Sequence, residues 1–104
     1  MFKSIALLFF SAAVANAAGG TANGYIGRSC RSAVCPESTR NGRGIGNCVT
    51  CINGASIQAD VDPECAVAWF SDTNCVNLIS RSSGAVDGCI DTGNFASYYV
   101  VCTQ

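Results

Sequence analysis

The most regular alternation of apolar and polar residues along the chain lies in residues 48–61. Asn53-Gly54 in its middle tolerates the positive φ angles of a two-residue type I′ turn, so the segment is predicted to form a β-hairpin. Cys48 and Cys51 are an odd number of residues apart and point to opposite faces of a strand. The two cysteines are therefore expected to form disulfides with two different neighbours and not with each other.

Three further segments predict strands. Residues 25–35 are a candidate first strand, and residues 75–80 are another. Residues 95–103 are the densest in β-branched and aromatic residues, and they give the strongest strand prediction in the chain. Residues 36–47 contain one large apolar residue and three alternating glycines, so they are predicted to be a loop.

The residues that follow the predicted hairpin carry the signals of a helix start. Asp62 is a capping residue, Pro63 stands at the first helical position and Glu64 supplies an early acid. Residues 65–70 are therefore predicted to form a short helix that docks on the sheet. The expected fold class is α+β: a small disulfide-stapled two-layer sandwich with an antiparallel sheet of about four strands and one short helix.

Residues 1–17 have the layout of a secretory signal peptide. Lys3 precedes an apolar run, and Ala15-Asn16-Ala17 has the small-x-small pattern of a cleavage site. The run is too short to span a bilayer, so no stable membrane insertion is expected. Residues 18–104 are expected to form a single cysteine-rich domain of a secreted, extracellular protein.

The cysteine content indicates a disulfide framework. A domain this small buries a modest core, and secreted domains of this size commonly add covalent cross-links. Four disulfides are expected, and their pairing is left open because eight cysteines allow about 105 full pairings. The expected disulfide residues are Cys30, Cys35, Cys48, Cys51, Cys65, Cys75, Cys89 and Cys102. Zinc binding and thiol redox chemistry are disfavoured by the oxidising compartment, the lack of histidine and the lack of a helix after the Cys-x-x-Cys segment.

Composition excludes several functional classes. The expected mature chain has five arginines, seven acidic residues and no lysine or histidine. Histidine-dependent hydrolase triads, histidine-based ribonuclease chemistry and lysine Schiff-base catalysis are therefore excluded. The negative net charge argues against nucleic-acid binding. We predict no catalytic, cofactor-binding or metal site, and we do not expect an enzyme.

Two pairs of residues are candidates for partner binding. Arg40 and Arg43 make the glycine-rich segment the most basic exposed point of the predicted fold. Tyr98 and Tyr99 are neighbours in a predicted strand, so they face opposite sides and one of them is expected to be exposed. Exposed aromatic and arginine side chains are frequent contact residues in interfaces.

The leader, the short mature chain, the eight cysteines and the missing catalytic groups together resemble the secreted cysteine-rich effectors of plant-associated fungi. The chain is also similar to the small killer toxins encoded by smut-fungus viruses. The segments that carry this likeness are Arg28-Ser-Cys-Arg-Ser-Ala-Val-Cys35 and Gly93-Asn-Phe-Ala-Ser-Tyr-Tyr-Val-Val-Cys102. The resemblance implies a compact α/β sandwich that blocks growth or channels in target cells.

The expected function is that of a monomeric, non-enzymatic effector or toxin-like protein that acts outside the cell on a host or competitor protein. One alternative is a carbohydrate- or cell-wall-binding module that uses Tyr98 or Tyr99 to bind a glycan. A second alternative is a small secreted hydrolase that uses an acid such as Asp60 or Asp91.

Overall fold

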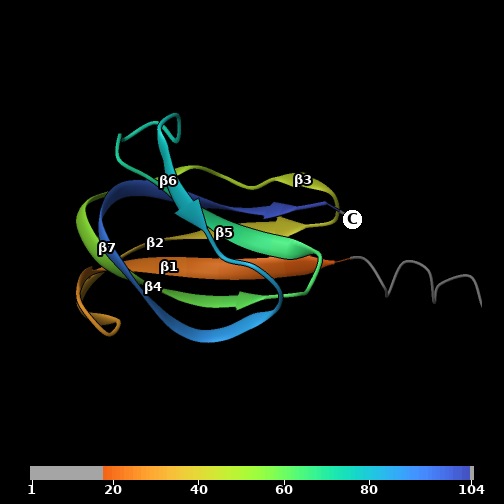
Figure 1. The fold of residues 1–104 in the computed structure, drawn as a ribbon, viewed down its shortest axis with the longest axis horizontal. Helices are drawn as coiled ribbons and strands as arrows, with labels where there is room; N and C mark the ends of the chain where they lie inside the picture. The colour runs from red at the N-terminus through yellow and green to blue at the C-terminus, as the bar shows by residue number, and fades with distance from the viewer. Residues whose placement is uncertain (1–17, 104) are drawn as a thin grey trace, which may run out of the picture.

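The computed structural model describes residues 18–103, and in this range the chain is all-β (Figure 1). Seven strands follow one another in the chain: β1 (Gly19–Gly27), β2 (Arg31–Asn41), β3 (Gly44–Ile45), β4 (Val49–Val61), β5 (Cys65–Phe70), β6 (Leu78–Arg81) and β7 (Val86–Cys102). The α+β prediction is therefore wrong, because no helix is present among the described residues. The signal peptide expected in residues 1–17 lies outside the described residues.

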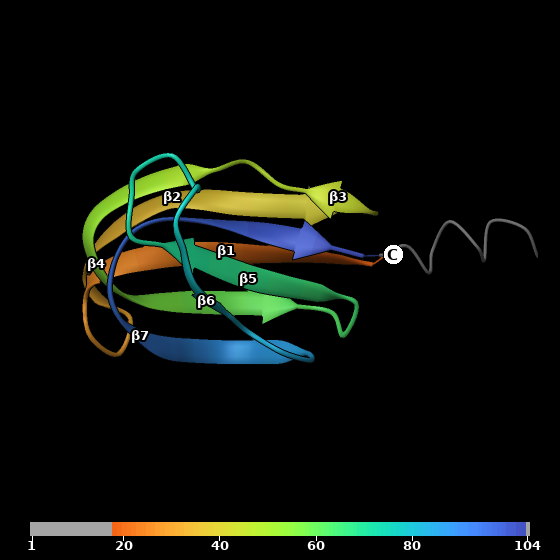
Figure 2. The same ribbon diagram turned by 45° about the horizontal axis from the view of Figure 1, so that its top comes forward.

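All neighbouring strands are antiparallel, in the order β2-β1-β4-β7-β5-β6, and β3 pairs with β7 off this path. β7 pairs with β4 along residues 86–98, with register shifts near the middle, and with β5 through residues 97–102. Figures 1 and 2 show β4 and β7 curving together around one end of the molecule. The sheet therefore folds over itself, and its two halves face each other across the core.

The core fills the space between these two halves. Its largest fully buried side chain is Tyr98, and the ring of Phe95 meets the Tyr98 ring edge-on with centroids 5.8 Å apart. Further buried apolar residues come from four strands: Ala22, Val49, Ile57, Ala59, Val61, Val67, Trp69 and Val100. A core of this kind joins residues that are far apart in sequence, which is typical of a β-sandwich.

The Tyr98 hydroxyl links three strands at the centre of the core. It accepts a hydrogen bond from the Gly24 N–H at 2.8 Å and donates one to the Pro36 carbonyl. Burial raises the pKa of this hydroxyl above its usual value of 10.0. A side chain at Gly24 would collide with the Tyr98 ring, because an added Cβ would lie 2.7 Å from a ring carbon. The close approach of β1 to the tyrosine therefore requires glycine at this position.

The predicted hairpin in residues 48–61 is instead the single strand β4. Asn53 does adopt a positive φ of 64°, but it lies in a β-bulge where the β4–β7 register shifts between Thr50 and Ser56. An added Cβ on Gly54 would lie 2.3 Å from the Phe95 ring. Asn53-Gly54 thus bends β4 around Phe95 and does not reverse the chain.

The predicted helix at residues 65–70 is the strand β5, and all six of its residues are buried. Six apolar residues in a row fit a strand that is covered on both faces, and a stable helix would need more length. The Asp62 carboxylate accepts a hydrogen bond from the Gly19 N–H at 2.9 Å and does not cap a helix. The Cys65 N–H donates to the Asp62 carbonyl at 2.9 Å, which closes the turn between β4 and β5.

The segment predicted to be a loop, residues 36–47, is also largely strand. Its first six residues belong to β2, and two more form β3. β2 is an edge strand, and such a strand tolerates Pro36 because its outer backbone groups need no partner strand. The loop prediction was wrong because it relied on the length of residues 36–47 and on their three glycines.

Every described cysteine is in a disulfide, which confirms the predicted framework. The pairs are Cys30–Cys89, Cys35–Cys51, Cys48–Cys75 and Cys65–Cys102. Cys48 and Cys51 have different partners, as the odd spacing predicted. Four intramolecular disulfides in so small a chain are typical of extracellular proteins.

The two adjacent tyrosines provide a matched test of the core. Tyr98→Phe removes the acceptor of the Gly24 N–H and should lower the free energy of unfolding by about 1–3 kcal/mol. Tyr99→Phe should change it far less, because Tyr99 is partly exposed and no hydrogen bond joins its hydroxyl to another described residue. Urea unfolding of both variants with intact disulfides measures the difference. Equal effects of the two substitutions would contradict the central role of the Tyr98 hydroxyl.

Candidate functional site

The two arginines predicted to bind a partner lie at the turn between β2 and β3. The Arg40 guanidinium donates hydrogen bonds to the Gly42 carbonyl at 3.2 Å and to the Arg43 carbonyl. Arg40 therefore holds its own turn, and part of its side chain is covered. Arg43 is exposed.

The two tyrosines face opposite sides of β7, as the strand geometry predicted. Tyr98 is fully buried in the core and offers no surface to a partner in this fold. Tyr99 is partly exposed on the outer face, and its ring packs on the Phe70 ring with centroids 5.0 Å apart. Of the pair, only Tyr99 lies where a partner could reach it.

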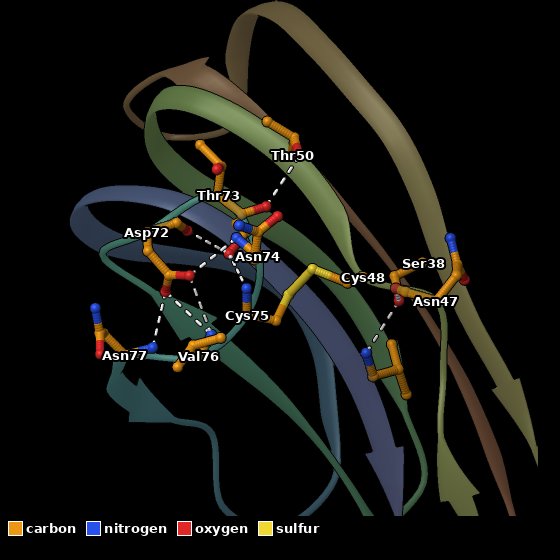
Figure 3. The surroundings of a disulfide bond; sticks show 12 residues. Ser38, Asn47, Cys48, Thr50, Asp72, Thr73, Asn74, Cys75, Val76 and Asn77 are labelled. Carbon is orange, nitrogen blue, oxygen red and sulfur yellow. Dashed lines mark hydrogen bonds between the residues drawn. A yellow bond between two sulfur atoms is a disulfide. The ribbon is translucent and has the colours of Figure 1, made fainter.

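A well-ordered loop that the sequence did not single out joins β5 to β6. We call residues 71–77 the Asp72 loop. The Asp72 carboxylate accepts hydrogen bonds from the backbone N–H groups of Asn74 at 3.0 Å, Val76 at 3.0 Å and Asn77 at 2.7 Å (Figure 3). These bonds stabilise the charged form, so they lower the pKa of Asp72 below its usual 3.8, with the Asn77 N–H contributing most.

The Asp72 loop is also fastened to the strands beneath it. The Cys48–Cys75 disulfide ties it to the residue before β4. The buried Ser97 hydroxyl accepts a hydrogen bond from the Cys75 N–H at 3.0 Å and donates one to the Asp72 carbonyl at 2.5 Å. The Thr50 hydroxyl donates to the Thr73 carbonyl at 3.1 Å, which adds a second link to β4 (Figure 3).

This rigid loop and the strand that follows it display aliphatic side chains to solvent. Val76 is 71% exposed, Leu78 is 55% exposed and Ile79 is 44% exposed. We call these three residues the apolar patch. No residue of the Asp72 loop is buried, so the loop contributes nothing to the core. The three residues lie within four consecutive positions of the chain. Exposed apolar residues that are neighbours on a fixed segment commonly mark an interaction site.

The outer face of the sheet formed by β6, β5 and β7 lies next to the apolar patch. Residues directly opposite one another on neighbouring strands share a face. Ala68 of β5 pairs with Tyr99 of β7 on one side and with Arg81 of β6 on the other. Ala66 pairs with Val101 in the same way. Ala66 and Ala68 are only 5% and 3% exposed, so larger neighbouring side chains cover this face of β5.

A hollow of about 240 Å³ lies beside the first residues of β5. The start of β5, the turn between β6 and β7 and the end of β7 line it, with Glu64, Ala66, Arg81, Ser83, Val101 and Thr103 among its residues. Arg81 and Glu64 are exposed, and neither side chain forms an ion pair or hydrogen bond with another described residue. Among the described residues, the hollow therefore has one unpaired guanidinium, of Arg81, and one unpaired carboxylate, of Glu64, beside Ala66 and Val101.

The sequence contains only a weak signal for this surface. Val76, Leu78 and Ile79 could be read as strand residues, but their exposure depends on their place at the sheet edge. Arg81 could be recognised as the sole basic residue after Arg43, yet its position opposite Tyr99 requires the register of three strands. Among residues 18–103, no cluster of three or more histidine, cysteine or acidic side chains is placed to hold a metal ion.

The pKa of Asp72 predicts how the loop responds to acid. A lowered pKa means that the carboxylate stabilises the loop at every pH above 3.8, and this contribution is lost as the pH falls through the lower folded-state value. The amides of Asn74, Val76 and Asn77 should stay protected from hydrogen exchange at pH 4 to 7 and lose protection below that range. NMR-detected exchange measures this.

The substitution Asp72→Ala should remove the same protection at every pH and leave the amides of β5 protected. Unchanged exchange in the Asp72 loop of this variant would contradict the role assigned to the carboxylate.

Comparison of the chain with models of known families, with curated proteins and with solved structures gives no significant match. Within residues 18–103, the structure also contains no helix with the length and apolar character needed to cross a membrane.

Proposed function

We propose that the protein is a secreted, non-enzymatic binding protein that acts outside the producing cell on a protein of a host or competitor. The observation that carries the proposal is the apolar patch, three aliphatic side chains exposed on a rigid loop and on the strand β6 that follows it. The extracellular setting is supported by the four disulfides and by the leader expected in residues 1–17.

The construction of the Asp72 loop favours binding. A flexible loop loses conformational entropy when it binds, whereas a loop already fixed by a carboxylate and a disulfide loses little. The loop is fixed although it packs nothing into the core. Its hydrogen bonds and its cross-link therefore serve to hold Val76 and the adjoining β6 in one arrangement.

The chemistry of the patch favours a protein partner over a glycan. Proteins that bind sugars commonly stack them on exposed aromatic rings, but every aromatic side chain among the described residues is buried or partly buried. The patch is aliphatic, which suits the apolar centre of a protein–protein interface. The resemblance to fungal secreted proteins implies an effector or toxin role. In that role the partner is a protein of a host or of a competitor.

A capture experiment with matched variants tests the proposal. The disulfide-intact protein is immobilised and exposed to solubilised surface proteins of plant cells and of a competing fungus, and bound proteins are quantified by mass spectrometry. Leu78→Asp and Val76→Asp should reduce recovery of the true partner by about tenfold or more, since they place a charge in the interface. The dissociation constant of the purified partner is then measured for each variant.

Val34→Asp is the matched control, because Val34 is an equally exposed aliphatic residue, at 57%, on the opposite edge strand β2. It should leave recovery of the partner unchanged. A partner that is lost equally with Val34→Asp and Leu78→Asp binds by general hydrophobicity, and that result would overturn the proposed role of the apolar patch.

A further inference from the structure

We propose that the disulfide Cys48–Cys75, which we call the loop disulfide, is a redox-sensitive switch that a small thiol of the glutathione class opens while the core of the protein stays cross-linked. The inference rests on the proposed function and adds its regulation, because Val76 of the apolar patch directly follows Cys75. Reduction of the loop disulfide releases the Asp72 loop and abolishes binding of the partner protein.

The four disulfides differ in burial. We call Cys35–Cys51 and Cys65–Cys102 the core disulfides, because three of their four cysteines are only 1–3% exposed. The other two disulfides each join an exposed cysteine to a half-buried one, and we call them the outer disulfides: Cys48–Cys75 and Cys30–Cys89. A reducing thiolate has to reach one of the two sulfur atoms, so the outer disulfides are the ones open to attack.

The backbone also distinguishes the outer disulfides from the core disulfides. Cys75 has a φ of 57° and Cys30 a φ of 55°, whereas no cysteine of the core disulfides has a positive φ. A β carbon disfavours this left-handed region, so the conformation persists only where the surrounding structure holds it. Reduction removes one of the restraints on Cys75, and its return to a negative φ is then favourable. Exposed or strained disulfides are accordingly the most easily reduced.

The loop disulfide holds the segment that positions Val76. Cys75 is the only cysteine in the Asp72 loop, so this disulfide is the only cross-link between the loop and the sheet (Figure 3). The hydrogen bond from the Cys75 N–H to the Ser97 hydroxyl depends on the same backbone conformation. No residue of the loop is buried, so no core packing keeps it in place after reduction.

The reaction is an ordinary thiol–disulfide exchange. A thiolate of the reductant attacks one sulfur of the loop disulfide, the S–S bond breaks, and the other sulfur leaves as a thiolate that takes up a proton. A second thiol of the reductant then resolves the mixed disulfide. The products are the thiols of Cys48 and Cys75 and one disulfide of the reductant. The form that binds is therefore the stable one in an oxidising extracellular space, and it is lost in a reducing compartment.

Stepwise reduction tests the order in which the disulfides open. The native protein is equilibrated in glutathione buffers of increasing reducing strength, free thiols are alkylated, and the modified cysteines are mapped by mass spectrometry. Cys48 and Cys75 should be alkylated at a reducing strength about tenfold or more below the one that opens either core disulfide. A loop disulfide that does not open before both core disulfides would overturn the proposal.

A double variant tests what the loop disulfide does. Cys48→Ser combined with Cys75→Ser should raise the hydrogen-exchange rates of the Val76 and Asn77 amides by about tenfold or more, because the loop opens locally. It should weaken binding of the captured partner by a similar factor. The amides of β5 should stay protected, which shows that the fold is intact. Wild-type protein with only the loop disulfide reduced and alkylated gives the same measurements if the variant does not fold.

The second outer disulfide provides the matched control. Cys30→Ser combined with Cys89→Ser removes an equally exposed cross-link, which ties the turn between β1 and β2 to β7. It should change the exchange of the Asp72 loop and the binding of the partner by less than about twofold. Equal losses in the two double variants indicate general destabilisation and would also overturn the proposal.

The outcomes separate this inference from the proposed function. Unchanged loop exchange or unchanged binding in the variant without the loop disulfide overturns the switch. If Leu78→Asp still reduces capture of the partner in that case, the proposed function stands alone. If capture is indifferent to Leu78→Asp, the proposed function fails, and the regulation of binding fails with it whatever the order of reduction.

Discussion

The pairing of β4 with β7 is the interaction on which the rest of the structure depends. These two strands bend together, so one continuous ladder supplies both halves of the sandwich. The bend packs around Phe95, which meets Tyr98 edge-on and leaves no room for a side chain at Gly54. Such long-range pairing brings little local stability, and a core this small has limited burial to offset the entropy of ordering the chain. The four disulfides add the stability that the core does not provide, and each disulfide is typically worth roughly 2–4 kcal/mol.

The candidate site follows from the way β7 leaves this bend. The second half of β7 pairs with β5, and β5 in turn pairs with the short strand β6. All six residues of β5 are buried, so its neighbours cover both of its faces. The Asp72 loop begins where β5 ends and is held by Ser97 of β7. The strand that organises the core thus also fixes the loop.

Local chemistry was predictable from the sequence, whereas chain direction was not. The odd spacing of Cys48 and Cys51 correctly predicted separate disulfide partners, and the β-rich segment at residues 95–103 was correctly placed in a strand. Asn53 does have a positive φ, but a bulge and a turn require the same residues, and only the packing of Phe95 against Gly54 distinguishes them. Asp62-Pro63-Glu64 likewise begins a turn as well as it would begin a helix. The placement of Arg81 and Tyr99 on either side of Ala68 depends on the register of three strands, which no local pattern encodes.

The contrast between the core and the Asp72 loop bears on how a small extracellular protein can present a binding surface. Exposed aliphatic residues favour aggregation when they lie on a long, flat sheet edge. Here β6 has four residues, and its pairing with β5 is interrupted by an irregularity between Trp69 and Phe70. A short, irregular edge resists strand-by-strand association but still exposes its side chains. Leu78 and Ile79 can therefore stay exposed without recruiting other chains through their backbone, and the side chains of the apolar patch determine which partner binds.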